Sequence, residues 1–201
     1  MKQISFRQYR AIDLAILSVI LFAAEMITAK AAGEWFPDEL YTLSPTAAVI
    51  CIVMMRWNGY AVFPAIAGGA AYCLALGASF PYYAVYCAGN CFALIAMLLF
   101  RISGKEKVRE KPVNTLIFTA AAYVGVCLGR GLGTAVISGK NIFDAFVSFL
   151  TADSLSLVFS AVVVLLARNI DGLFEDQKAY LIRTEAERRR AQSPDPFDDG
   201  L

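Results

Sequence analysis

The chain has 201 residues, of which 58% are apolar and 17% are charged, and its mean hydropathy is +0.57. This composition favours a membrane protein and excludes both a disordered chain and an ordinary soluble domain. The formal net charge is +1, so composition gives no reason to expect nucleic acid as a partner.

Six apolar stretches follow one another along the chain, each long enough or nearly long enough to cross a hydrocarbon core of about 30 Å. The first is too long for the apolar region of a signal peptide and no cleavage site follows it, so we expect it to be retained. The stretches cover residues 9–32, 43–56, 59–79, 82–100, 114–138 and 146–167. We therefore predict an all-α fold, an integral membrane six-helix bundle over residues 1–168. A cytoplasmic charged helical extension and a disordered tail are expected over residues 169–201.

Lysine and arginine are sorted by side in this topology. With the N-terminus inside, fifteen of the eighteen are cytoplasmic, and the segment 101–111 (RISGKEKVREK) is the strongest marker. Lys30 and Lys140 lie near the outer ends of helices, and Arg130 lies within one. By the positive-inside rule, both termini are expected in the cytoplasm of a multi-pass plasma-membrane protein.

Small residues mark the third and fifth predicted helices. The third carries small residues between Ala65 and Ala71, and the fifth carries Gly125, Gly129, Gly131 and Gly133. Such residues predict close approach of neighbouring backbones, or kinking in the fifth helix. The five cysteines all lie inside predicted helices without a CxxC spacing, and we interpret them as packing residues.

Polar groups gather in the outer half of the bundle, at one depth in five different helices. An ionisable group inside a span is costly, so each is a candidate for function. Arg130 suits a carboxylate or phosphate through its planar donors, and we expect it to contact the ligand. The alternative is that it only pairs with Glu25 or Asp153. The predicted substrate-binding residues are Glu25, Trp35, Tyr72, Tyr83, Tyr86, Asn90, Arg130, Thr134, Asp153 and Ser156.

Trp35 belongs to an acidic and aromatic segment, residues 33–41, predicted as the first outer loop. It is either an anchor at the membrane surface or a lid residue over the site. The converging polar stripes predict a pocket for a small organic ligand, open to the outside.

Six helices in about 200 residues, with an outer polar pocket and an aromatic first outer loop, resemble the substrate-binding S components of energy-coupling factor (ECF) transporters. Ala11-Ile-Asp-Leu-Ala15 matches the AxxxA pattern that these subunits carry near the cytoplasmic end of helix one. Two alanines one turn apart expose backbone against which a partner helix can pack. The resemblance implies a vitamin-like substrate, and Ala11 and Ala15 as contacts for a transmembrane coupling subunit that works with two ATPase subunits.

The rival interpretations are a stand-alone small-solute permease, a membrane enzyme and a structural scaffold. We expect no enzyme, since no histidine and no GxSxG motif occur. The same lack of histidine removes bis-His haem ligation and most zinc sites, so we expect no cofactor and no metal. No GxxxxGK[ST] loop occurs, so we expect no nucleotide on this chain. The pocket would suit a zwitterionic or anionic heteroaromatic compound, and its identity stays open.

Overall fold

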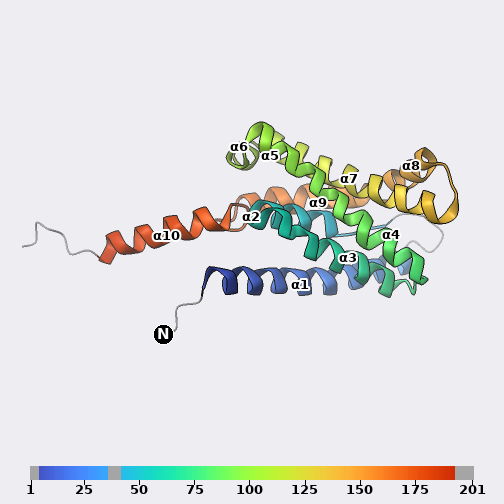
Figure 1. The fold of residues 1–201 in the computed structure, drawn as a ribbon, viewed down its shortest axis with the longest axis horizontal. Coiled ribbons are helices and arrows are strands. Elements are labelled where there is room, and N and C mark those ends of the chain that lie inside the picture. Colours follow the sequence, from blue (N-terminus) through green and yellow to red (C-terminus); the bar gives the residue numbers. More distant parts are fainter. Residues whose placement is uncertain (1–4, 36–41, 193–201) are drawn as a thin grey trace, which may run out of the picture.

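The structure, a computed structural model, describes residues 5–35 and 42–192, with side chains as far as Glu187. Within these residues all regular structure is helical, with no strand, which confirms the predicted all-α class. Figure 1 shows the elements: α1 (Phe6–Trp35), α2 (Thr46–Trp57), η1 (Asn58–Ala61), α3 (Val62–Ala75), α4 (Phe80–Cys91), η2 (Phe92–Met97), α5 (Leu98–Ser103), α6 (Lys105–Glu110), α7 (Pro112–Ser138), α8 (Ile142–Ala152), α9 (Ser154–Arg168) and α10 (Gln177–Gln192).

The apolar helices are those of a membrane protein. Four helical stretches are long and apolar enough to cross a bilayer, namely residues 6–35, 46–75, 80–103 and 112–138. α8 and α9 pass the same test together but are bent by 56° where they meet, so the number is five if this pair forms one span.

The stretch 46–75 turns back on itself at Asn58. This residue has a φ of +55° and a ψ of −128°, a positive-φ conformation that residues other than glycine rarely adopt, and Gly59 follows it. A methyl group added to Gly68 would collide with the side chain of Thr46, so the start of α2 lies against the middle of α3. α2, η1 and α3 therefore form a helical hairpin.

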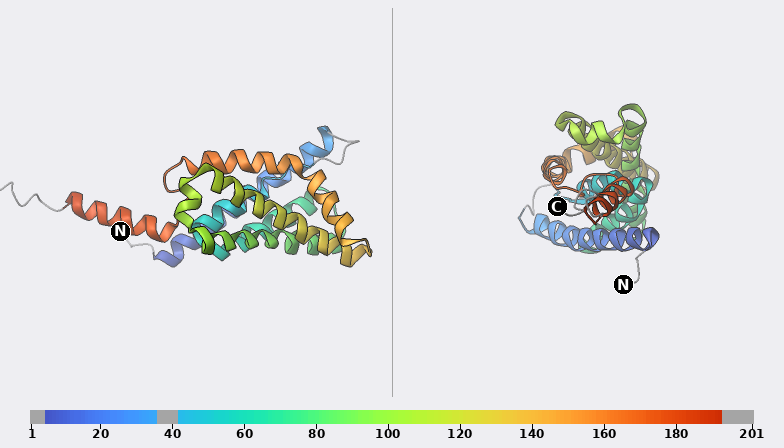
Figure 2. Two further views of the ribbon diagram at one scale, coloured as in Figure 1. Left: turned by 90° about the horizontal axis from the view of Figure 1, so that it is seen from above. Right: turned by 90° about the vertical axis from the view of Figure 1, so that its left-hand side faces the viewer.

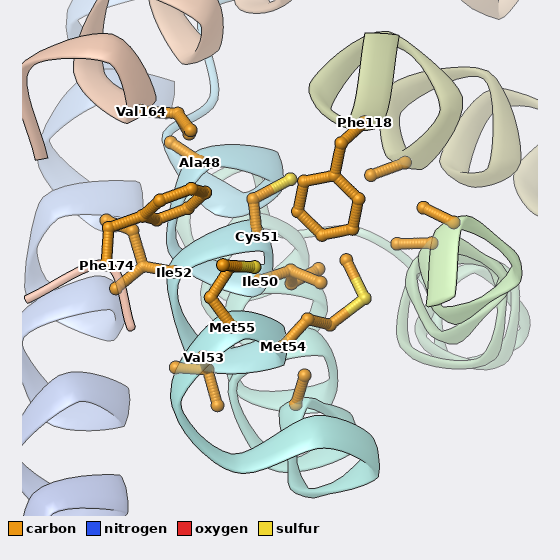
Figure 3. Close-up of a cluster of buried hydrophobic side chains, with 14 of the residues drawn as sticks. Ala48, Ile50, Cys51, Ile52, Val53, Met54, Met55, Phe118, Val164 and Phe174 are labelled. Carbon is orange, nitrogen blue, oxygen red and sulfur yellow. The ribbon is translucent and has the colours of Figure 1, made fainter. Parts of the chain in front are cut away.

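α2 is the centre of the core. Every residue of α2 except Val49 is buried, because other helices surround it. Figure 3 shows Cys51 and Met54 beside Phe118 of α7, and Phe174 near Ile52. An apolar helix only 12 residues long is thus enclosed by protein along its whole length.

The N-terminal end of α1, the short helix α6 and the start of α10 lie at one end of the bundle, and α8 lies at the other (Figure 1). α10 projects away from the bundle in Figure 1 and in the left-hand view of Figure 2.

The segment between α9 and α10, residues 169–176, packs into the N-terminal end. Phe174 is fully buried, and Arg56 donates to the carbonyl oxygen of Gly172 at 2.6 Å. Lys105 pairs with Asp176 at 2.7 Å and Arg109 with Glu175 at 2.5 Å. Packing of the bundle therefore continues past residue 168 and includes Gln177, the first residue of α10, which is 1% exposed.

Three predicted elements differ in detail. The last helix, expected as one rod over 146–167, starts at Ile142 and breaks at Asp153. The segment 101–111, expected as a loop, contains the end of α5 and all of α6. α1 extends to Trp35, so the expected outer loop begins with helix, and its residues 36–41 lie outside the described part of the chain.

Candidate functional site

A connected set of buried polar side chains lies in the half of the bundle away from the N-terminus. It draws on α1, α3, α4, α7, the start of α9, and the short segment 42–46, which ends at the first residue of α2. Glu25 and Asn90 have no exposed surface, and Arg130 is 3% exposed. Because the surroundings are apolar helices, each of these groups needs a partner inside the protein.

Arg130 reaches this position because α4 and α7 pack closely through glycine. A methyl group added to Gly89 would lie 2.7 Å from the backbone nitrogen of Arg130, and one on Gly129 would collide with the Gly89 carbonyl oxygen. The small residues predicted to allow close packing of the fifth helix therefore do so, at the contact that carries the arginine. A larger residue at either glycine would push the helices apart.

The guanidinium of Arg130 joins three helical segments. Its Nη1 pairs with Oδ2 of Asp153 at 2.5 Å, and its Nε donates to Oδ1 of Asn90 at 2.9 Å. Asn90 in turn donates to the carbonyl oxygen of Ala65 on α3 at 3.0 Å. Arg130 thus has an internal counterion, which is the pairing that the sequence left open as the alternative to ligand contact.

Two tyrosines flank the arginine. The rings of Tyr72 and Tyr86 stack with centroids 4.6 Å apart. The guanidinium carbon of Arg130 lies 4.7 Å from the centroid of Tyr86 and 6.0 Å from that of Tyr72. Phe149 of α8 meets the edge of Tyr86, with centroids 6.1 Å apart. The result is an aromatic wall beside the buried charge, of the kind that stabilises a cation through its ring faces.

The break between α8 and α9 supplies groups that a continuous helix would keep for itself. The carbonyl oxygen of Ala152 accepts from the backbone nitrogen of Thr42 at 3.0 Å, and that of Leu150 accepts from the hydroxyl of Tyr123 at 2.9 Å. The hydroxyl of Thr42 donates to Asp153 as well. The helix break therefore serves to dock the segment 42–46 against the charged centre.

Ser156 completes this docking. Its hydroxyl accepts from the backbone nitrogen of Ser44 at 2.9 Å and donates to the carbonyl oxygen of Thr42 at 3.2 Å. The segment 42–46 thereby joins α9 to α1, because its other side chains turn toward Glu25.

Glu25 is satisfied on one side only. The hydroxyls of Ser44 and Thr46 both donate to its Oε2, at 2.8 and 2.7 Å. Its Oε1 is buried and has no hydrogen-bond partner, as is also true of the hydroxyls of Thr134 and Ser160.

The structure brings together seven of the ten predicted substrate-binding residues, directly or through the segment 42–46: Glu25, Tyr72, Tyr86, Asn90, Arg130, Asp153 and Ser156. The other three show no described contact with them. Trp35 is 72% exposed at the end of α1, and Tyr83 and Thr134 are half-buried.

Sequence reasoning missed Thr42, Ser44 and Thr46. The signal was present as the polar run Thr42-Leu-Ser44-Pro-Thr46 just before a helix start. Among the described residues, no group of three or more His, Cys, Asp or Glu side chains is placed to hold a metal ion.

A groove lies at the opposite end of the bundle, between α1 and the η1–α3 turn. Its volume is about 510 Å³, and its lining includes both predicted partner-binding residues, Ala11 and Ala15. The rest of its lining comes from Arg7, Arg10, Leu14, Ser18, Tyr60 and Phe63. Arg10 lies over the ring of Tyr60 at 4.0 Å from its centroid.

No family model, curated protein or solved structure matches this chain.

Proposed function

We propose that the chain is a substrate-binding subunit of the plasma membrane that captures a vitamin-like micronutrient from the outside. The observation that carries this proposal is the buried cluster of Glu25, Arg130 and Asp153 on separate elements of an apolar bundle. Ionisable groups within a membrane cost several kcal/mol each and are generally kept for a ligand, ion or proton. Binding to aromatic and charged side chains is the role that this set of groups supports.

The proposed topology has six spans with both termini in the cytoplasm. The turn at Asn58 supports dividing the helical stretch 46–75 into two passes, one on each side of the turn. The bent pair α8–α9 supports one more pass. Arg56, Lys105 and Arg109 lie at the same end as the start of α1, as the charge sorting of the sequence requires. In this orientation the polar cluster lies in the outer half.

The groove at Ala11 and Ala15 is the proposed contact for a coupling subunit. It is lined by small and apolar side chains at the cytoplasmic end, and a helix of a partner can approach the alanine backbone closely. A chain that binds substrate at one end and a coupling subunit at the other acts as the S component of an ECF transporter. ATP hydrolysis would then belong to two partner subunits.

Isolation of the intact assembly tests this function. The chain is tagged at its N-terminus in its native host, extracted in mild detergent and purified, and the partners are identified by mass spectrometry. We expect one further integral membrane protein and ATPase subunits in stoichiometric amount.

A stand-alone permease would behave differently. It would accumulate substrate in proteoliposomes without ATP or any partner, whereas the proposed subunit would bind substrate and transport none alone. Transport by the purified chain would therefore reject the coupled role.

A further inference from the structure

The buried charges of the polar cluster do not balance. It holds one cation, Arg130, and two carboxylates, Glu25 and Asp153. Asp153 takes the arginine as its ion-pair partner. Among the described residues no ion pair includes Glu25, so this buried carboxylate has no ion-pair partner of its own there.

The hydrogen bonds of Glu25 also leave this carboxylate incompletely satisfied. Its Oε2 receives the two hydroxyl protons that the segment 42–46 supplies, and the hydroxyl of Ser44 is itself held by the backbone nitrogen of Thr46. Its Oε1 receives none, although the side chain has no exposed surface. A fully buried carboxylate oxygen without a donor is costly, because a carboxylate accepts several hydrogen bonds when it is stable in an interior.

A second buried polar group without a described partner lies on α9. Ser160 follows Ser156 by one turn of α9, on the face whose hydroxyl contacts Ser44, and its own buried hydroxyl has no partner. As a hydroxyl it can donate or accept a hydrogen bond.

We propose that Glu25 is the primary ligand-recognition group and that the ligand presents a positively charged N–H donor, an ammonium or amidinium, to its Oε1. This inference rests on the proposed function and names its substrate class. An N–H cation supplies both the missing donor and the missing charge, while the anionic group expected from the sequence would meet an arginine already paired with Asp153. The stacked Tyr72 and Tyr86 lie beside the same charged centre and suit an aromatic body carrying that donor.

Three compounds with one ring system test the charge preference. Pyridoxamine, pyridoxine and 4-pyridoxate share a hydroxymethyl-pyridinol and differ at one substituent, which is an ammonium, a hydroxyl or a carboxylate. Binding of each to the full chain in lipid nanodiscs at pH 7 is measured by equilibrium dialysis. We expect pyridoxamine to bind at least about tenfold more tightly than 4-pyridoxate.

The variant Glu25→Gln keeps the shape of the side chain and removes its charge. We expect it to weaken pyridoxamine about 30-fold or more, the loss typical of a buried charge-assisted contact, and to change pyridoxine by less than about threefold. Glu34→Gln is the matched control, because it removes an exposed carboxylate from the same helix and should leave all three affinities unchanged. Should Glu25→Gln fail to fold, Glu25→Asp shortens the reach instead and should still lower the ratio of pyridoxamine to pyridoxine affinity.

Three results would overturn the inference: tighter binding of 4-pyridoxate, a preference that survives Glu25→Gln, or no binding of any of the three compounds at 10 mM (about the weakest affinity that a ligand contact of 2–3 kcal/mol gives). None of these results tests the proposed role as a subunit of an ATP-coupled transporter. That role is judged by recovery of the coupling and ATPase subunits with the wild-type chain, which does not depend on these probes.

Discussion

Replacing Arg130 tests whether the buried ion pair holds this fold together. In Arg130→Met the side chain of Asp153, 7% exposed, stays inside the bundle without its cation. Breaking one partner of a buried pair costs about 3–5 kcal/mol, because the charge that is left has neither water nor a counterion. Oδ1 of Asn90 also loses the hydrogen bond that Arg130 Nε donates to it, worth about 1 kcal/mol more. We therefore expect the ligand-free protein to lose about 4–6 kcal/mol of unfolding free energy.

The double variant Arg130→Met/Asp153→Asn isolates the charge from the packing. Removing both charges replaces an unpaired carboxylate by a neutral amide of nearly the same shape, so most of the loss should return. Unfolding is followed by circular dichroism in detergent over a denaturant series for the four members of the cycle. A double variant no more stable than Arg130→Met would refute the reasoning, because the cost would then arise from lost packing and not from the stranded charge.

Three further predictions address other parts of the molecule. Ala15→Trp should fill the groove and reduce recovery of the coupling subunit at least about tenfold while ligand binding stays intact. Ile20→Trp, at an exposed position of the same helix, should leave recovery of the coupling subunit unchanged. Loss of ligand binding with normal assembly would mean that the two sites had been assigned the wrong way round. A cysteine placed at Glu106, on a background without the five native cysteines, should resist an impermeant thiol reagent in intact cells, while one placed at Trp35 should react. Reaction at position 106 would show that the orientation in the membrane is the opposite of the one proposed. Partial burial would by itself raise the pKa of Asp176, but the hydrogen bond and charge of Lys105 outweigh it and hold the pKa below its ordinary value of 3.8. Its stabilising contribution is therefore present above pH 3.8 and is lost as the pH falls through the lowered pKa, so the gap in stability between wild type and Asp176→Asn should close on acidification, and a gap independent of pH would contradict this.

The choice of candidate residues could be predicted largely from the sequence, because depth in a membrane helix follows from position along the chain. Glu25, Asn90, Arg130 and Asp153 were selected by depth and helical face alone, and the structure joins Arg130 to Asn90 and Asp153 directly. Tyr83 is predicted on the same grounds and Trp35 from its place in the expected outer loop, and neither shows a described contact with this set. The helical period gives the face of a residue but not the neighbour that the face meets.

Pairing within the site depended on tertiary structure. Hydropathy predicts a single rod across Asp153, since no proline or glycine marks a break there. The break is stabilised by partners distant in sequence, such as Thr42 on the freed carbonyl of Ala152 and Tyr123 on that of Leu150. Which acid would take Arg130 was likewise open, and only the packing of α4, α7 and α9 assigned it to Asp153 and left Glu25 to the hydroxyls of the segment 42–46.

By itself the sequence determined that the helices suit a lipid bilayer, that the fold is helical, and that the charges are sorted along the chain. These properties follow from local hydropathy and from the cost of placing charge in hydrocarbon. Three features belong to the tertiary structure: the hairpin at Asn58, the burial of Phe174 from the segment after α9, and the different partners of the buried carboxylates Glu25 and Asp153. Each depends on contacts between residues far apart in the chain, and their free energies exist only once the helices have packed.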